Sequence, residues 1–98
     1  MVRRLRKRNY GLNQLKKLVY LISPNKINNK FYLDLDKVLS YKNVNFFQLR
    51  LKKIKKNILF KIANKIKKIT SKHKVKLIIN DDFILASRIK ADGCHMGQ

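Results

Sequence analysis

The sequence predicts an α/β fold built on a parallel sheet, and three observations support this prediction. Short apolar runs alternate along the chain with segments in which apolar residues recur at helical spacing. The connections between them are short, so right-handed crossovers would place successive strands in parallel. With 98 residues, of which 45% are hydrophobic, the chain forms one domain at most. A flavodoxin-like open sheet and half of an eight-stranded barrel both fit this order of elements.

The first predicted elements are two strands and the helix between them. Residues 18–22 form a continuous apolar run closed by Ser-Pro-Asn, which predicts a strand that is buried on both faces and ends at a turn. Residues 31–40 predict a short helix with Asp34 and Asp36 near its start, where the helix dipole favours acids. Residues 44–49 predict the second strand.

The clearest helix comes next, because isoleucines recur at steps of four and three residues with lysines opposite: Ile54, Ile58, Ile62, Ile66 and Ile69. A lysine-rich amphipathic helix also fits a membrane surface, but a position between two predicted strands favours packing on the sheet. The remaining elements are a strand over residues 75–79, a short helix over 82–90 and a fourth strand-like segment over 91–96.

The charge of the chain is strongly unbalanced. Twenty-five Lys and Arg against five acidic residues give a formal net charge of +20, which is typical of proteins that bind polyanions. Because lysine is spread through nearly every segment, we interpret most of this charge as solvated surface and expect no nucleic-acid partner. Residues 1–17 are assigned to a basic tail and residues 18–98 to the domain. The single Cys94 and the lack of a long apolar run indicate the cytoplasm and no membrane partner.

Polar side chains follow the second predicted strand. In the segment QLRLK, residues 48–52, the two-residue period of an extended chain puts Gln48, Arg50 and Lys52 on one side. In parallel α/β folds, reactive groups gather at the C-terminal ends of strands. Arg50 can hold a phosphate by two parallel hydrogen bonds and Lys52 adds a point charge. The segment therefore predicts an anion clamp suited to a diphosphate.

Asn80, Asp81 and Asp82 follow the third predicted strand. One interpretation is an Asx turn in which an Asp caps the following helix. The other assigns Asp81 to Mg²⁺, a hard cation held by one or two carboxylates together with substrate phosphate oxygens. Both interpretations hold together if Asp82 caps the helix and Asp81 binds the metal.

Cys94 and His95 are adjacent, and we do not expect them to form a zinc site. Their spacing is not that of metal ligands, and neighbouring strand residues face opposite ways. We interpret Cys94 as a small buried apolar residue. His73 stands in a lysine-rich turn and is interpreted as a solvated helix end.

Four segments together resemble the thiamine-phosphate synthase family: YLISP (20–24), QLRLK (48–52), IND (79–81) and ADGCHMGQ (91–98). Each belongs to or follows the expected strand, in the expected order. The resemblance implies that the chain is the N-terminal half, about four β/α units, of a TIM (β/α)8 barrel. It also implies a transferase that couples hydroxymethylpyrimidine diphosphate to a thiazole phosphate, releasing pyrophosphate and making thiamine phosphate.

Carried over by position, the resemblance implies a set of site residues. Those that would bind the pyrimidine diphosphate are Gln48, Leu49, Arg50, Leu51, Lys52 and Asn80. Asp81 would ligate Mg²⁺, and His95 and Gln98 would line the floor of the pocket. Two positions depart from the family pattern: Leu51 stands where an acidic residue is usual, and Asp82 where an Arg is usual.

The length of the chain limits what it can do alone. Because a full barrel needs about 200 residues or more, we expect the isolated chain to be catalytically inactive and to self-associate through exposed sheet edges. Two alternatives stay open at this point. One is a thiazole tautomerase, which shares the barrel but has no need of a diphosphate clamp. The other, of a different class, is a small basic protein that binds nucleic acid with steeply salt-dependent affinity.

Overall fold

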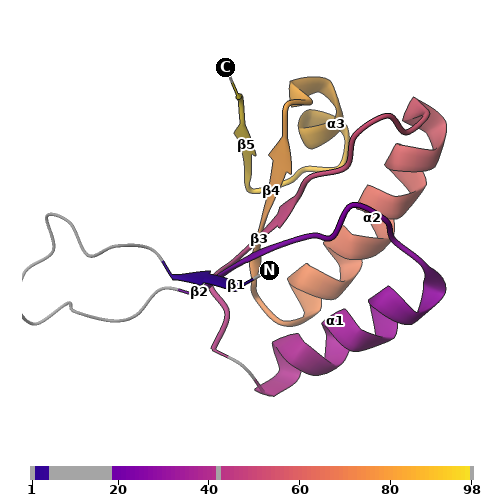
Figure 1. Ribbon diagram of the computed structural model, residues 1–98. Helices are drawn as coiled ribbons and strands as arrows, with labels where there is room; N and C mark the ends of the chain where they lie inside the picture. Colours follow the sequence, from indigo (N-terminus) through magenta and orange to yellow (C-terminus); the bar gives the residue numbers. More distant parts are fainter. Residues whose placement is uncertain (1, 5–18, 42, 98) are drawn as a thin grey trace, which may run out of the picture.

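The computed structural model describes residues 2–4, 19–41 and 43–97 (Figure 1). Five strands and three helices follow one another within these residues: β1 (Val2–Arg4), β2 (Val19–Ile22), α1 (Asn29–Tyr41), β3 (Phe46–Leu49), α2 (Lys56–Lys72), β4 (Lys76–Asn80), α3 (Phe83–Arg88) and β5 (Gly93–His95). From β2 onward the order of strands and helices is the predicted one.

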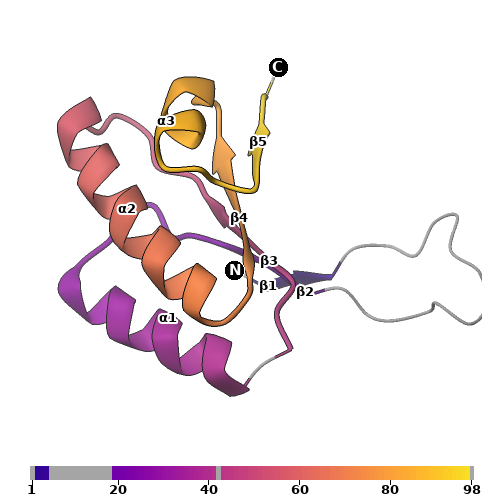
Figure 2. The same ribbon diagram turned by 180° about the vertical axis from the view of Figure 1, so that it is seen from behind.

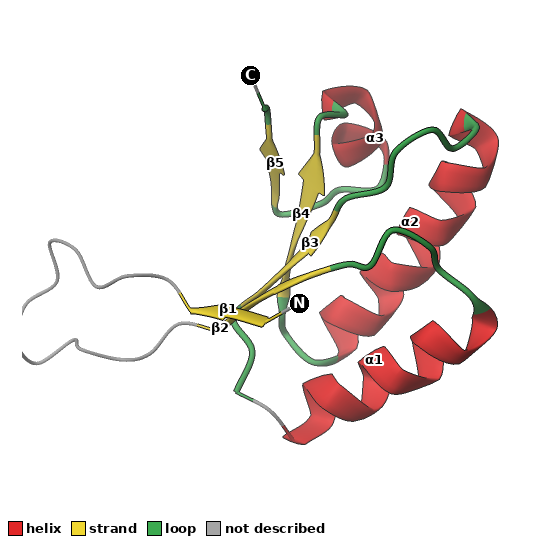
Figure 3. Ribbon diagram, in the orientation of Figure 1, coloured by secondary structure: helices red, strands yellow, loops and turns green. Residues whose placement is uncertain are grey.

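The strands form a single sheet in the order β1-β2-β3-β4-β5. β2 to β5 pair in parallel, and one helix joins each of them to the next (Figure 3). A flavodoxin-like sheet requires the strand order to reverse at a switch point, whereas strands of a (β/α) barrel stay in chain order. The structure therefore decides between the two architectures and confirms an α/β fold consistent with half of a TIM barrel.

All three helices cover the same face of the sheet (Figures 1 and 2). Alternate residues of the strands point to this face and form the core, each of them 6% exposed or less: Leu21, Phe47, Leu49, Leu77 and Ile79. From α2, Ala63 and Ile66 are added with no exposed surface. The two-residue period of the strands thus separates a core face from a face that is free to hold polar groups.

On that second face the strand registers align side chains in rows. Ile22, Gln48, Ile78 and Gly93 form one row. A Cβ at Gly93 would lie 2.9 Å from the Cδ1 atom of Ile78, so only glycine fits there without a shift. Within the described residues no helix covers this face (Figures 1 and 2).

The prediction that the first strand is buried on both faces is wrong for the described part of the chain. In β2, Leu21 is the one buried residue, and its neighbours on the other face are half-buried. An apolar run alone does not reveal whether a second layer covers a strand.

Helix α1 begins earlier than predicted, at Asn29. Asp34 and Asp36 therefore lie in its middle, and the prediction that they stabilise its N-terminus through the helix dipole is wrong. The side chain of Asn28 caps this helix instead, because its Oδ1 accepts a hydrogen bond from the N–H of Phe31 at 2.9 Å.

Asp36 reaches from α1 to the end of α2. It lies 2.6 Å from Nε2 of His73 and 3.2 Å from Nζ of Lys72. His73 is the C-cap of α2, as expected, but its side chain is only 13% exposed, so the prediction that it is solvated is wrong. The hydrogen bonds from His73 and then Lys72 hold the pKa of Asp36 below its usual value.

The prediction that Asp82 caps the following helix is confirmed. Its carboxylate accepts a hydrogen bond from the N–H of Leu85 in α3 at 2.9 Å.

Two cation–π contacts connect neighbouring helices. Lys65 of α2 lies over the ring of Tyr32 in α1, and Arg88 of α3 lies over the ring of Phe60 in α2.

Strand β1 lies within the predicted basic tail and pairs antiparallel with β2. Residues 2–4 are the only residues of this tail that the structure describes. The edge of β2, expected to be unpaired, is therefore covered, and β5 is the opposite edge of the described sheet. No helix in the described ranges has the length and apolar character needed to cross a membrane.

Candidate functional site

The polar residues predicted from the sequence gather where the parallel strands end. Gln48 lies in β3, and Arg50 follows it by two residues. Asn80 is the last residue of β4, Asp81 is the next, and His95 is the last residue of β5. Because β3, β4 and β5 are neighbours in the sheet, these ends meet at one rim of the fold.

A hydrogen-bond network joins four strands at this rim. The hydroxyl of Tyr20 donates to Oε1 of Gln48, and Nε2 of Gln48 donates to Oδ1 of Asn80 at 2.8 Å. Nδ1 of His95 lies 3.2 Å from the same Asn80 oxygen. Because this oxygen only accepts, the contact requires a proton on Nδ1, and in a neutral ring of that tautomer Nε2 is an acceptor. Each of the two amide NH₂ groups keeps a second hydrogen for a ligand.

Asp81 is held by its backbone and by its side chain. Its φ of 61° is left-handed, a conformation in which Asp is several-fold enriched among non-glycine residues. Oδ1 accepts from the N–H of Gly97 at 2.5 Å, and Oδ2 accepts from Nδ2 of Asn80 at 2.9 Å. A Cβ at Gly97 would stand 3.0 Å from Oδ1, so glycine permits this close approach. Because each carboxylate oxygen can accept more than one bond, capacity for a hard cation remains.

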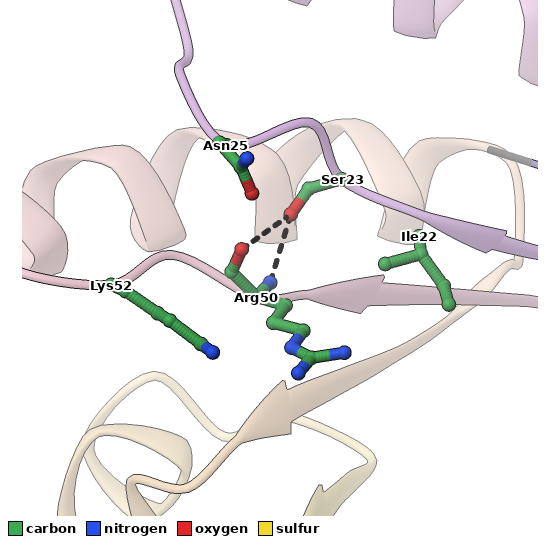
Figure 4. Close-up of a pocket in the computed structure, with 5 residues that line it drawn as sticks. All are labelled: Ile22, Ser23, Asn25, Arg50 and Lys52. Atoms are coloured by element: carbon green, nitrogen blue, oxygen red, sulfur yellow. Dashed lines mark hydrogen bonds between the residues drawn. The ribbon is translucent and has the colours of Figure 1, made fainter.

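Arg50 and Lys52 line an open cavity of about 350 Å³ together with Ile22, Ser23 and Asn25 (Figure 4). Figure 4 shows the two basic side chains extending from the same side of the chain, with Ser23 and Asn25 on the loop that follows β2. Both cations are exposed, and among the described residues neither belongs to an ion pair. The cavity therefore offers uncompensated positive charge to an anion.

The structure brings the predicted residues together as two adjoining groups. Gln48, Asn80, Asp81 and His95 share the hydrogen-bond network, whereas Arg50 lines the cavity with Lys52. Asp81 is not among the residues that line this cavity. The two-residue step from Gln48 to Arg50 along the chain links the groups.

The remaining predicted positions have different surroundings. Leu49 is 2% exposed and its side chain belongs to the hydrophobic core, and that of Leu51 packs against this core. Gln98 lies outside the described residues.

Cys94 pairs with Ile79 and packs against the core, while His95 pairs with Asn80. The two residues thus face opposite sides of β5, as expected. In the part of the chain that the structure describes, no group of three or more His, Cys, Asp or Glu side chains could hold a metal ion. A metal at this rim would take Asp81 from these residues, and its further ligands from outside them.

Sequence reasoning missed four residues of the rim: Tyr20, Ser23, Asn25 and Gly97. The two-residue period of β2 could have suggested Tyr20, which is the partner of Phe46 in the same sheet row. The other three are placed by loops, for which the sequence gives no period.

The comparisons with known proteins cover most of the chain. The family model described as "Thiamine monophosphate synthase" matches residues 19–98. A thiamine-phosphate synthase of Pelagibacter ubique (strain HTCC1062) is 61% identical over 84 residues, which are 85% of this chain and 41% of that protein. A thiamine-phosphate synthase of Methanobrevibacter smithii is 37% identical over 87 residues, which are 89% of this chain and 42% of that protein. The matched span is therefore about two fifths of the length of these curated relatives.

Proposed function

The chain belongs to the thiamine monophosphate synthase family, and we propose that it supplies the diphosphate-binding part of a thiamine-phosphate synthase. In this proposal the whole enzyme couples hydroxymethylpyrimidine diphosphate to a thiazole phosphate and releases pyrophosphate. The observation that carries the proposal is the open cavity lined by Arg50 and Lys52, next to the network of Gln48 and Asn80. A cytoplasmic location, which the single Cys94 favours, belongs to the same proposal.

The task of these residues follows from the reaction. The bond between the pyrimidine methylene carbon and the diphosphate oxygen breaks, the diphosphate leaves with the electron pair, and the thiazole nitrogen forms the new bond to carbon. Negative charge builds on the departing diphosphate, and fixed cations stabilise that charge better than water does. Arg50 can bind two phosphate oxygens at once, and Lys52 neutralises further charge.

The amide network is suited to the other end of the same substrate. A pyrimidine ring with an amino group presents both donors and acceptors at its edge. Gln48 and Asn80 each retain an N–H, and Nε2 of His95 is an acceptor in the arrangement described above. We assign these three side chains to orienting the pyrimidine while Arg50 and Lys52 hold the diphosphate.

Mg²⁺ fits the donor set at Asp81. Mg²⁺ takes one or two carboxylates and completes its octahedron with water and phosphate oxygens, and the Asp81 carboxylate is oriented by Gly97 and Asn80. When bound, the ion would neutralise charge on the leaving diphosphate. Asp81 would hold it, and the hydrogen bonds from Gly97 and Asn80 would fix the carboxylate in place.

Binding of inorganic pyrophosphate by isothermal titration calorimetry tests the site directly. Arg50→Ala should weaken binding by about tenfold or more, because it removes charge-assisted hydrogen bonds. Arg88→Ala is the matched control, since Arg88 lies over Phe60, 4.3 Å from the ring centroid, and lines a different pocket. If both variants bind pyrophosphate as the parent does, or if the parent binds none, the proposed site is wrong.

A further inference from the structure

Ser23 links the end of β2 to the residue that follows β3. Its backbone N–H donates to the carbonyl of Gln48 at 2.9 Å. Its hydroxyl oxygen accepts from the N–H of Arg50 at 2.8 Å and donates to the carbonyl of Arg50 at 3.3 Å, as Figure 4 shows. Ser23 is 7% exposed, so water competes little for these bonds.

The Ser23 hydroxyl makes the hydrogen bonds to Arg50 that backbone groups of β2 would make if the strand continued. In a parallel ladder that continued past Ser23, the Arg50 N–H would donate to the Ser23 carbonyl, and the Arg50 carbonyl would accept from the N–H of Asn25. Pro24 fixes φ at its own position and restricts the residue before it, and here the chain leaves the sheet toward α1. One hydroxyl, acting as both donor and acceptor, satisfies both backbone groups of Arg50.

We propose that Ser23 is the positioning residue for Arg50, holding its main chain so that the guanidinium is presented to the anion cavity. Arg50 lies after the last residue of β3, so the regular ladder does not hold it there. An arginine on a fixed main chain loses less conformational freedom when it binds an anion. This inference rests on the proposed function, because it requires the cavity of Arg50 and Lys52 to bind a diphosphate.

Pyrophosphate titration of hydroxyl variants tests the role of Ser23. Ser23→Ala should weaken binding about tenfold, whereas Ser23→Thr, which keeps the hydroxyl, should stay within about twofold of the parent. Ser40→Ala is the matched control: it also removes a hydroxyl that donates to a backbone carbonyl, that of Lys37 at 2.6 Å, but on α1. It should leave the affinity unchanged.

A double-mutant cycle separates positioning from a general structural role. If Ser23 acts through Arg50, then Ser23→Ala should cause no further loss once Arg50→Ala has removed the guanidinium. The same fractional loss in both backgrounds would overturn the proposal, and so would full affinity in Ser23→Ala.

Two further outcomes are decisive. Absence of pyrophosphate binding by the parent would overturn the proposed function and this inference with it. If Ser23→Ala does not fold, hydrogen exchange of the Arg50 amide in the parent decides. Protection of this amide supports a main chain held by Ser23, and exchange at the rate of an exposed loop amide overturns it.

Discussion

Asp81 and Asp82 are neighbouring carboxylates that the fold uses differently. Asp82 has the backbone of an N-cap and binds the N–H of Leu85. Asp81 has a left-handed backbone, and its carboxylate lies at the rim beside Gly97. The left-handed backbone also occurs at Lys53, Lys74 and Lys90, so the position of the Asp81 carboxylate at the rim, and not its backbone angle, suggests a function.

If Asp81 holds Mg²⁺ as proposed, the ion should raise the affinity for pyrophosphate. Asp81→Asn should abolish that increase, because an amide is a weaker ligand for a hard cation. Asn tolerates the left-handed backbone at this position, so the fold should persist. Asp82→Asn is the control, since Asn is an equally good N-cap. Titrations with and without Mg²⁺ measure the effect. Full enhancement retained in Asp81→Asn would contradict the metal assignment.

At the scale of elements, α1 and α2 are joined by a charged contact at their ends. Asp36 on α1 accepts hydrogen bonds from Lys72 and lies against His73, which caps α2. Asp36 therefore acts through this contact between helices, and not through the dipole of α1 as the sequence suggested.

Asp36→Asn should lower the urea midpoint of unfolding at pH 7. The pKa of Asp36 is lowered in the folded state, so its contribution to stability is fully present above the unfolded value of about 3.9 and is lost as pH falls through the folded value. The difference between parent and variant should therefore narrow below about pH 4. Asp34→Asn, on the same helix, is the control. A difference that stayed constant down to pH 3 would exclude this linkage.

The isoleucine stripe of α2 contains positions with very different burial. Ile66 has no exposed surface, whereas Ile58 is 45% exposed. Ile66→Ala should cost about 2–5 kcal/mol of unfolding free energy, because it leaves a cavity in the core. Ile58→Ala should cost less than about 1 kcal/mol. Chemical denaturation measures both, and equal losses would mean that α2 packs on the sheet by a different face.

At the scale of the whole molecule, an exposed sheet edge and the net charge have opposite effects on self-association. β5 is the edge opposite β1 in the described sheet, and an unpaired edge is a template for another strand. A formal net charge of +20 keeps copies of the chain apart at low ionic strength.

We expect self-association of the chain to increase with salt. Screening shortens the range of charge repulsion to about 3 Å at 1 M salt, from about 10 Å at 0.1 M, while backbone pairing at an edge is little affected. Size exclusion with light scattering should give a mass near the monomer at low salt and a larger mass at high salt. A monomer at every salt concentration would show that the β5 edge is protected.

From β2 onward, the sequence by itself determined the types of the elements and their order, because two-residue and helical periods follow from local backbone geometry. It did not reveal β1, which lies in the segment assigned to a basic tail. It also determined the cap at Asp82 and the opposite orientations of Cys94 and His95. Boundaries shifted by a few residues, as at the start of α1, where a side-chain cap sets the limit.

Only the tertiary structure decided which contacts the polar residues make. The strands lie in chain order and all helices cover one face of the sheet. This arrangement distinguishes half of a barrel from an open doubly wound sheet. It brought Gln48 against Asn80 and Asp36 against His73, pairs that are 32 and 37 residues apart in the chain. The Ser23 hydroxyl came to bind both backbone groups of Arg50 because the chain leaves the sheet after β2, just before Pro24. Such contacts depend on register and on loops, and neither leaves a local period in the sequence.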